Sequence, residues 1–382
     1  MDRKNAVRTI MFILPLVAAV LSVIYSPACR KVFFKVQEVA VYLNMPMEKA
    51  NFEEENTTDK ESTTENTINT TSATTQADEQ SAEVANRFEK KELTETPSDI
   101  AAKQKEYSVK IKSETKKGDI TEEPYLGGGK SVVYEGIKIQ SKIPESFYKL
   151  DIKKLLSMGA DLSIEDKSKP TVLIYHSHTT ETYQMLDVGY YTTAFNQRSD
   201  DISRNMVRVG DEITARLEKA GFKVIHDRNI YDKNYNQAYN LSDKSVRKYL
   251  EQNPSIDVTI DVHRDAIQFD NGTKVKPTKV INGKKAAQIM IIPGCEYDNV
   301  KDFPDWEYNL RFALQVQQMA EKMYPGLMRP ILFSARRYNL FETHNSILLE
   351  MGSDANTLDE ACYSGRLIGE VLAKVLDKYV KG

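Results

Sequence analysis

From about residue 147 to residue 379, short apolar runs alternate with segments in which hydrophobic residues recur every three or four positions. The runs are rich in β-branched residues, as in buried strands, and the second spacing is typical of amphipathic helices. Strands and helices that alternate in this way predict an α/β fold, with a sheet sandwiched by helices. The predicted strands are 171–175, 222–225, 257–262, 286–292 and 347–350, and the predicted helices are 205–220, a helix capped by Ser242 that ends near Gln252, 306–323 and 357–379.

The N-terminal part of the chain predicts a membrane anchor. Residues 10–25 read IMFILPLVAAVLSVIY, without a charge, and three basic residues precede them. This length is at the short end for a transmembrane helix. A cleaved signal peptide is the alternative, because Ser26 and Ala28 are small enough for a cleavage site, but Pro27 disfavours cleavage there. We expect an uncleaved, single-pass anchor in the cell membrane, with the following domain outside the cytoplasm.

The segment after the anchor predicts disorder. From Asn51 to about Lys105, Thr, Asn, Glu, Asp and Ser dominate, and almost no large apolar residue is available to offset the entropy of ordering. Further on, 132–134 and 137–139 predict small strands, and Gly127–Gly129 predicts a hinge, because it lacks the context of a phosphate-binding loop. The predicted organisation is 1–31 for a cytoplasmic tip and the anchor, 32–105 for a juxtamembrane segment and the disordered tether, 106–165 for an extended arm or accessory region, and 166–382 for the α/β domain.

Composition argues against nucleic acid as a partner and against cysteine chemistry. The formal net charge is −3, and no basic stripe is present along the chain. The excess of acidic residues lies mainly in the tether. Three cysteines at unrelated spacings, Cys29, Cys295 and Cys362, predict neither a disulfide framework nor a cysteine-based zinc site.

Three of the predicted strands lead into histidine or glutamate. His178 and Glu181 follow the first of these strands. His263 follows another strand, and Glu350 ends a third. In an open α/β sheet the ligand site lies at the carboxyl ends of the strands, so we expect these residues to meet in one cleft. Two neutral imidazoles and a carboxylate hold Zn²⁺, and a free carboxylate takes a proton from water. The pattern therefore predicts metal-assisted hydrolysis.

Each of these residues also has an ordinary alternative. The His-x-x-Glu turn of His178 and Glu181 lets both side chains face one ion, but the same pattern is common by chance. For His263 the alternative is a buried histidine paired with neighbouring carboxylates. Glu350 ends a wholly apolar strand, where a carboxylate is costly to bury without a partner or a function. We expect His176 to bond to a carboxylate or to the backbone near the ion rather than to bind the ion itself.

Two other hydrolase folds and one non-enzymatic role compete with this interpretation. A metallo-β-lactamase needs His-x-His-x-Asp-His, which this chain lacks, and an amidohydrolase barrel needs more downstream histidines than a chain with five histidines provides. The alternative of another class is a membrane-anchored scaffold that binds the cell wall or partner proteins and has a degenerate metal site.

Four motifs carry a resemblance to a known family. YHSHTTETY, NMVRVGDEI, DVHRDA and LLEMGSDANTLDEA occur in this order, after an anchor and a polar tether. Over about residues 130–380 the chain resembles the stage II sporulation protein P family of endospore-forming bacteria, and more distantly the zinc-dependent N-acetylmuramoyl-L-alanine amidases. The resemblance implies a mixed, mostly parallel sheet flanked by helices. It also implies a membrane-tethered peptidoglycan hydrolase that acts during forespore engulfment, in the space between the mother-cell and forespore membranes.

The family is expected to remove the stem peptide from N-acetylmuramic acid, is also credited with cutting peptide cross-links, and acts with stage II sporulation protein D. By the resemblance, His178 and His263 are the zinc histidines and Glu350 is the catalytic glutamate. The lactyl and peptide carboxylates of this substrate need cationic contacts. The candidates for these cationic contacts are Arg264, Arg336 and Arg337. Arg264 and Asp265 directly follow His263, and they are expected to contact either the substrate or the residues that bind the ion.

The third zinc ligand is where the chain departs from the broader amidases. Those enzymes carry a glutamate at the start of the first helix, whereas this region here reads Arg198-Ser-Asp-Asp-Ile-Ser203. Asp200 or Asp201 is one choice. Glu181 is the preferred one, because zinc carboxypeptidases of related topology take a ligand from a His-x-x-Glu turn.

Overall fold

The computed structural model describes residues 89–124 and 131–381. They belong to one compact unit, assigned to Ala50–Gly382. The predicted anchor, the juxtamembrane segment, residues 51–88 of the tether and the Gly127–Gly129 hinge lie outside the described residues. Among the helices of the described residues, none is both long and apolar enough to cross a membrane.

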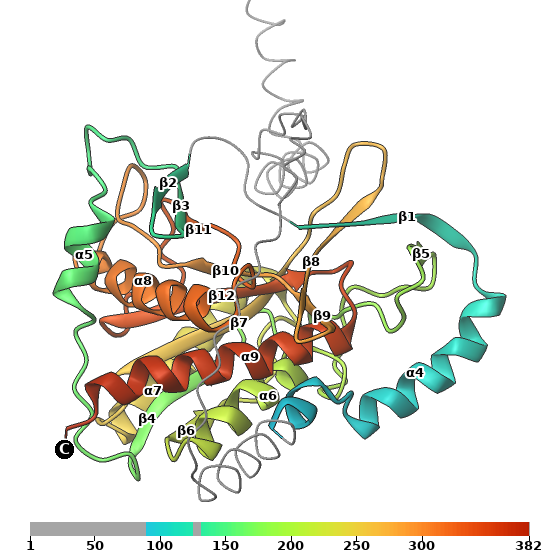
Figure 1. The fold of residues 1–382 in the computed structure, drawn as a ribbon, viewed down its shortest axis with the longest axis horizontal. Helices are drawn as coiled ribbons and strands as arrows, with labels where there is room; N and C mark the ends of the chain where they lie inside the picture. The colour runs from blue at the N-terminus through green and yellow to red at the C-terminus, as the bar shows by residue number, and fades with distance from the viewer. Residues whose placement is uncertain (1–88, 125–130, 382) are drawn as a thin grey trace, which may run out of the picture. The chain divides into compact units, whose positions relative to one another are not determined.

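A five-stranded sheet carries the strand that leads to His178 and Glu181 and the two strands that contain His263 and Glu350 (Figure 1). Four of its strands run parallel, and the fifth, at one edge, is antiparallel. This sheet is therefore mixed and mostly parallel, as predicted. In order across the sheet, the strands are β10 (Ile289–Ile292), β12 (Asn345–Ser353), β7 (Val258–Asp265), β4 (Pro170–Tyr175) and β6 (Lys223–His226).

Helices cover both faces of this sheet, and the side chains of β4 show why. Val172 and Ile174 belong to the main hydrophobic core, whereas Leu173 and Tyr175 belong to a smaller cluster with Val246. Successive residues of a strand point to opposite faces, so an uninterrupted apolar strand buries both faces. Helices α6 (Met206–Lys219), α8 (Trp306–Met323) and α9 (Leu358–Leu376) pack on the main core, and α7 (Ala238–Gln252) packs on the smaller cluster.

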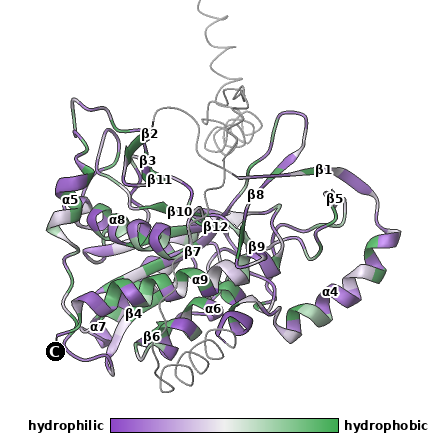
Figure 2. Cartoon of the chain, in the orientation of Figure 1, coloured by the Kyte–Doolittle hydropathy of each residue, from purple (hydrophilic) through white to green (hydrophobic). Residues whose placement is uncertain are grey.

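Helices α6 and α9 lie side by side (Figure 1) and approach closely at a glycine. A Cβ atom at Gly369 would lie only 2.7 Å from Cβ of Arg216. Asn205 caps α6 by accepting a backbone N–H two residues later, and Thr357 and Glu360 form a capping box at the start of α9. Figure 2 shows hydrophobic and hydrophilic residues following one another along these helices, as expected for amphipathic segments.

Within the described residues, two smaller sheets accompany the central one. The predicted strands at 132–134 and 137–139 are present as a hairpin, whose turn residues Glu135 and Gly136 both have positive φ, 47° and 82°. Two such residues are typical of the tight turn that matches the twist of the strands. The strand order of the first of these sheets is β5 (Tyr190–Thr192), β1 (Lys116–Glu123), β8 (Lys274–Ile281) and β9 (Lys284–Ala287). The strand order of the second, which contains the hairpin, is β11 (Ile331–Phe333), β3 (Ile137–Ser141) and β2 (Ser131–Tyr134).

The predicted tether extends too far into the chain. Residues 98–105 lie in helix α4 (Ser98–Lys110) and are not disordered. Ile100 is fully buried, and Asp99 accepts hydrogen bonds from Arg208 of α6. One buried apolar side chain and a salt bridge therefore attach a mostly polar helix to the domain, which composition alone did not reveal.

Further element boundaries differ from the prediction. The strands expected at 257–262 and 347–350 are longer, so His263 and Glu350 lie within β7 and β12 and not after or at the end of a strand. The single strand expected at 286–292 is two strands, β9 and β10, in different sheets. At the break, the backbone N–H of Gln288 donates to the carbonyl of Pro277 at 3.0 Å. Ser242 does not cap α7, which begins at Ala238. Ser242 lies inside this helix, where its hydroxyl bonds to the carbonyl of the first residue at 3.0 Å.

Candidate active site

The structure brings His178 and His263 together from two parallel strands. Strands β4 and β7 pair with Tyr175 beside Asp261, so the chain beyond β4 and the end of β7 reach the same edge of the sheet. The two imidazole rings stand almost perpendicular, with centroids 5.3 Å apart, and both residues are buried. Two histidines separated by 85 positions in the sequence therefore share one site.

Glu181 lies at this pair of histidines, and the two alternative carboxylates do not. Its Oε2 atom lies 3.8 Å from Nδ1 of His263. The same oxygen accepts the backbone N–H of Arg264 at 3.3 Å. Asp200 and Asp201 are exposed, and Asp201 accepts hydrogen bonds from the nearby residue 203. The preferred third candidate is thus the one placed beside the histidines.

Glu350 faces the same site from β12. In the parallel pair of β12 and β7, Glu350 is the register partner of His263. Its Oε2 atom is buried without a hydrogen-bond partner. Burial and the neighbouring carboxylates of Asp265 and Glu181 raise the pKa of Glu350 to about 8. This carboxyl is poised to exchange a proton near neutral pH.

The two histidines have opposite pKa shifts. Burial, together with the positive charges of His263 and Arg198, lowers the pKa of His178 to about 3, so its imidazole is neutral, the form that binds metals. Burial also opposes the charged form of His263, but Asp261 outweighs it and raises the pKa of His263 to about 9. Asp261 Oδ1 lies 2.8 Å from Nε2 of His263.

Asp261 also joins the two segments that carry the histidines. Its Oδ1 accepts the backbone N–H of Ser177 at 2.9 Å, and its Oδ2 accepts the Ser177 hydroxyl at 2.7 Å. One fully buried carboxylate therefore contacts His263 and the residue before His178. The pairing of His263 with Asp261 is the ordinary alternative stated for this histidine, whereas the contact of Asp261 with Ser177 was not predicted. The position of Asp261 two residues before His263, inside an apolar strand, was the available signal.

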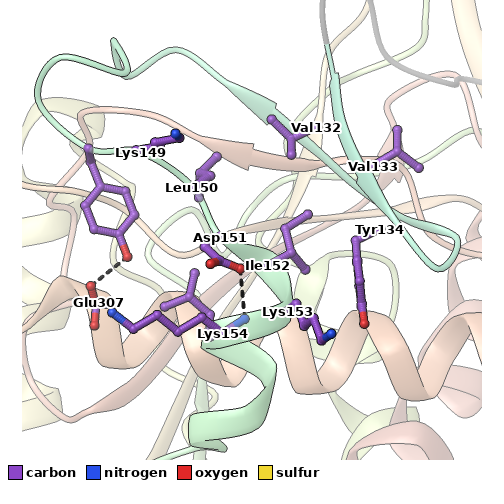
Figure 3. A pocket seen from close by; sticks show the side chains of 12 residues that line it. Val132, Val133, Tyr134, Lys149, Leu150, Asp151, Ile152, Lys153, Lys154 and Glu307 are labelled. Atoms are coloured by element: carbon purple, nitrogen blue, oxygen red, sulfur yellow. Dashed lines mark hydrogen bonds between the residues drawn. The ribbon is translucent and has the colours of Figure 1, made fainter.

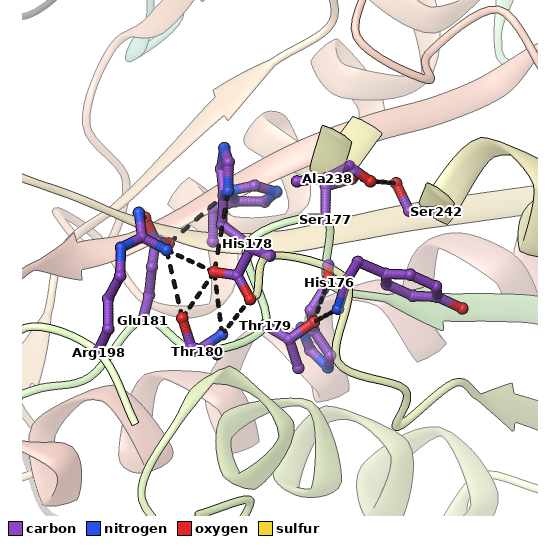
Figure 4. Close-up of polar contacts among 12 residues, drawn as sticks. His176, Ser177, His178, Thr179, Thr180, Glu181, Arg198, Ala238 and Ser242 are labelled. Atoms are coloured by element: carbon purple, nitrogen blue, oxygen red, sulfur yellow. Dashed lines mark hydrogen bonds and ion pairs between the residues drawn. The ribbon is translucent and has the colours of Figure 1, made fainter. Parts of the chain in front are cut away.

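A second buried carboxylate, Asp232, was also missed. It accepts the backbone N–H of Thr180 at 3.1 Å and the Thr180 hydroxyl at 2.7 Å, and it pairs with Arg198. The Arg198 guanidinium also donates to the Thr180 hydroxyl at 3.3 Å (Figure 4). The Oδ2 atom of Asp232 lies 4.0 Å from Nδ1 of His178. The Arg198 guanidinium lies over the ring of Tyr235, which stacks on His178 at 4.5 Å between centroids. Asp232 and Tyr235 come from the polar segment after β6, whose sequence pattern carried no signal.

His176 bonds within the fold and not into the site. Its Nδ1 lies 2.9 Å from the carbonyl oxygen of Val262, and its Nε2 lies 2.9 Å from Nε2 of His226. Burial, with the added charge of His226, lowers the pKa of His176 to about 3. Gly210 of α6 leaves room for this pair, since a Cβ atom there would lie 2.6 Å from His226.

The other predicted neighbours support the loops around the site. Arg264 is buried and donates to the carbonyls of Thr182 and Gln197 at 2.8 and 2.9 Å, which fixes the long loop after Glu181. Asp265 pairs with the buried Arg329 at 3.0 Å. Arg336 donates to the carbonyl of its own neighbour, residue 335, at 3.1 Å.

The site offers the donors that zinc prefers. Nδ1 of His178 is buried without a hydrogen-bond partner, and a second imidazole and a carboxylate lie beside it. Across residues 89–124 and 131–381, however, no group of three or more His, Cys, Asp or Glu side chains is placed so that it could hold a metal ion. The chemistry of the donors thus fits zinc, whereas their present spacing does not form a closed ligand set.

The sequence matches one protein family over most of its length. The family described as Stage II sporulation protein P (SpoIIP) matches residues 30–373. The chain belongs to this family. Stage II sporulation protein P of Bacillus subtilis (strain 168) is 28% identical over 223 residues. That alignment covers 54% of this chain and 51% of the relative, so the chain spans about half the length of the curated relative it matches.

Solved structures of amidases are also similar to part of this SpoIIP-family chain. The N-acetylmuramoyl-L-alanine amidase AmiC2 of Nostoc punctiforme is 14% identical with a TM-score of 0.34, covering 56% of this chain and 98% of that one. The CwlD amidase from Clostridioides difficile, in complex with the GerS lipoprotein, is 17% identical with a TM-score of 0.32, covering 55% and 99%. At these scores the similarity supports no inference about activity.

Proposed function

We propose that this chain is a zinc-dependent peptidoglycan hydrolase that cleaves the amide between N-acetylmuramic acid and the stem peptide. The observation that carries the proposal is the convergence of His178, His263 and Glu181, with Glu350 in register beside His263. Membership in a sporulation protein family and the motif resemblance support the cell wall as substrate. Zinc held by these three side chains would supply Lewis acidity, which makes water acidic enough to attack near neutral pH and polarises the scissile carbonyl.

Glu350 is the proposed general base. Its buried, unpartnered Oε2 atom is free to accept a proton from the attacking water, and the same carboxyl then donates it to the leaving amine. A bound cation beside it would lower its raised pKa and favour the carboxylate. The low pKa of His178 keeps that imidazole neutral as a ligand.

Asp261 and Asp232 are the proposed positioning residues. Asp261 ties His263 to the segment that carries His178, and Asp232 anchors the turn between His178 and Glu181 through Thr180. Carboxylates that orient metal-binding histidines typically contribute 10- to 100-fold to metal affinity or activity. Both carboxylates are held by several hydrogen bonds, which would orient the segments that carry the two histidines.

The cellular setting follows as part of the proposal. We place the protein in the cell membrane through one helix within residues 1–31, with the hydrolase outside the cytoplasm, between the mother-cell and forespore membranes. Stage II sporulation protein D is the proposed partner, and cleavage of peptide cross-links is the proposed additional activity. The motif resemblance and family membership support these assignments.

Mass spectrometry of the products tests the reaction. Purified sacculi are incubated with the full chain in detergent, with and without added zinc, and the soluble fragments are analysed. Free stem peptides beginning with an unblocked amine are expected, together with glycan that has lost its peptides. Fragments that contain only glycan cleavage products would contradict amidase chemistry.

A scaffold that binds the wall or a partner is the second candidate. The observation in its favour is that the described residues form no closed group of three or more metal-binding side chains. Zinc content of the purified chain separates the two candidates. About one zinc per chain supports the hydrolase, and a metal-free chain that binds sacculi without releasing peptides supports the scaffold.

A further inference from the structure

A cleft of about 570 Å³ lies away from the candidate active site, between strand β2 and helix α5 (Ile152–Met158) (Figure 3). β2 is the outer strand of its sheet and, within the described residues, pairs only with β3. Val132 and Val133 on this strand are 38% and 59% exposed. An open strand edge with exposed β-branched residues is a ready template for another extended segment.

Three lysines and two acidic residues line the cleft, so its described lining carries a net positive charge. Lys149, Lys153 and Lys154 are exposed, and none of them lies within 4.0 Å of an acidic group in the described part of the chain. The two acidic residues of the lining accept hydrogen bonds from neutral donors and form no ion pair with these lysines in the described part of the chain. Asp151 accepts the backbone N–H of Lys154 at 3.0 Å, and Glu307 accepts a tyrosine hydroxyl at 2.6 Å. The cleft therefore combines an open strand edge with ammonium groups available to an acidic ligand.

The chain itself contains a segment of matching chemistry. Residues 51–88 hold nine acidic and two basic residues, a net charge of −7, which leaves +4 for the rest of a chain whose total is −3. Threonine is abundant in this segment, for example in TINTTSATT, and is favoured in strands. Charge and β-propensity both complement the cleft.

We propose that the acidic segment 51–88 docks in the cleft between β2 and α5, as an extended stretch along β2 with its carboxylates toward the three lysines. The segment has 38 residues, and a random-coil chain of that length spans roughly 34 Å on average, more than the ~19 Å radius of gyration of a domain of this size. Covalent attachment gives an effective concentration in the millimolar range, so a weak contact is still populated. Docking then shortens the reach of the domain from its N-terminal segment.

Limited proteolysis of the full chain in detergent tests this assignment. A glutamate-specific protease cleaves residues 51–88 at their many glutamates, and mass spectrometry follows each cut. The test variant carries Lys149→Gln, Lys153→Gln and Lys154→Gln, which introduce no new cleavage site. The matched control carries Lys223→Gln, Lys248→Gln and Lys301→Gln, three exposed lysines outside the cleft.

Cleavage of residues 51–88 is expected to be at least ~5-fold faster in the test variant than in the wild type, because cleavage follows the undocked population. The control variant should match the wild type, and 0.5 M salt should remove the protection. Equal rates in all three proteins, or an equal gain in the control, would refute docking in this cleft. Protection that grows with protein concentration would assign the segment to a second copy and overturn the intramolecular contact.

Discussion

Replacement of the proposed general base should separate proton transfer from metal binding. Glu350→Gln keeps the shape of the side chain, but a carboxamide is a far poorer base. We expect this variant to retain about one zinc per chain while turnover falls by a factor of at least ~10², which corresponds to about 2.7 kcal/mol in the activation free energy. His178→Ala and His263→Ala should lose both zinc and turnover, because each removes a ligand.

The structure indicates that Glu350→Gln changes the charge and the hydrogen bonds of this position little in the metal-free protein. Since the pKa of Glu350 is raised to about 8, its carboxyl is mostly neutral at pH 7 in the metal-free protein, and glutamine replaces one neutral group with another. The Oε2 atom it replaces has no hydrogen-bond partner to lose. An amide left unsatisfied at that position would cost about 1–3 kcal/mol of stability, which a thermal melt would detect.

The assay pairs zinc analysis with peptide release from sacculi for each variant. Glu181→Gln should weaken zinc binding by roughly 10-fold or more. Asp201→Asn is the matched control, because Asp201 is exposed and its carboxylate accepts hydrogen bonds from Ser203, two residues away. Zinc loss in Glu350→Gln would make Glu350 a ligand and leave the base unassigned. Normal zinc in Glu181→Gln with loss in Asp201→Asn would show that the third ligand is wrong.

Three other predictions concern stability. In metal-free protein the pKa values of His263 and Glu350 are raised to about 9 and 8, so the folded state binds more protons than the unfolded state. Its stability should therefore fall as the pH rises from about 6.5 to 9. The measurement is Tm against pH in the presence of a chelator, and Glu350→Gln should show a shallower slope. Gly369→Ala should lower the free energy of unfolding by about 1–3 kcal/mol and lower Tm, because the new Cβ atom would lie only 2.7 Å from Cβ of Arg216 in α6. An unchanged Tm would mean that α6 and α9 can move apart without loss of stability. Lys276→Met should lower the free energy of unfolding, measured by chemical denaturation, by about 3–5 kcal/mol. The substitution leaves the buried Glu360, whose carboxylate lies 2.9 Å from the lysine amine, without its cation. An unchanged free energy of unfolding would show that the Glu360 carboxylate is solvated.

Hydrophobic periodicity predicted those helices and strands whose burial pattern can be read along the sequence. Helix 306–323 has the predicted boundaries, and the strand at 171–175 differs from β4 by one residue, because apolar spacing and strand length are local properties of the sequence. Errors arose where tertiary contacts decided the outcome. Ile100 anchors an otherwise polar helix, and Gln288 divides one apolar run between two sheets, and neither event has a local signature.

The amino-acid sequence by itself determined which chemistry is available: two histidines and two glutamates follow or end buried strands, and parallel strands deliver their carboxyl ends to one edge. Only the tertiary structure decided which carboxylate stands beside the histidines, because Glu181, Asp200 and Asp201 are equally acidic in sequence and differ in burial. The same holds for the charge states. The raised pKa of Glu350 and the low pKa of His178 come from burial and from charges on other strands and loops, which are brought close only when the chain folds.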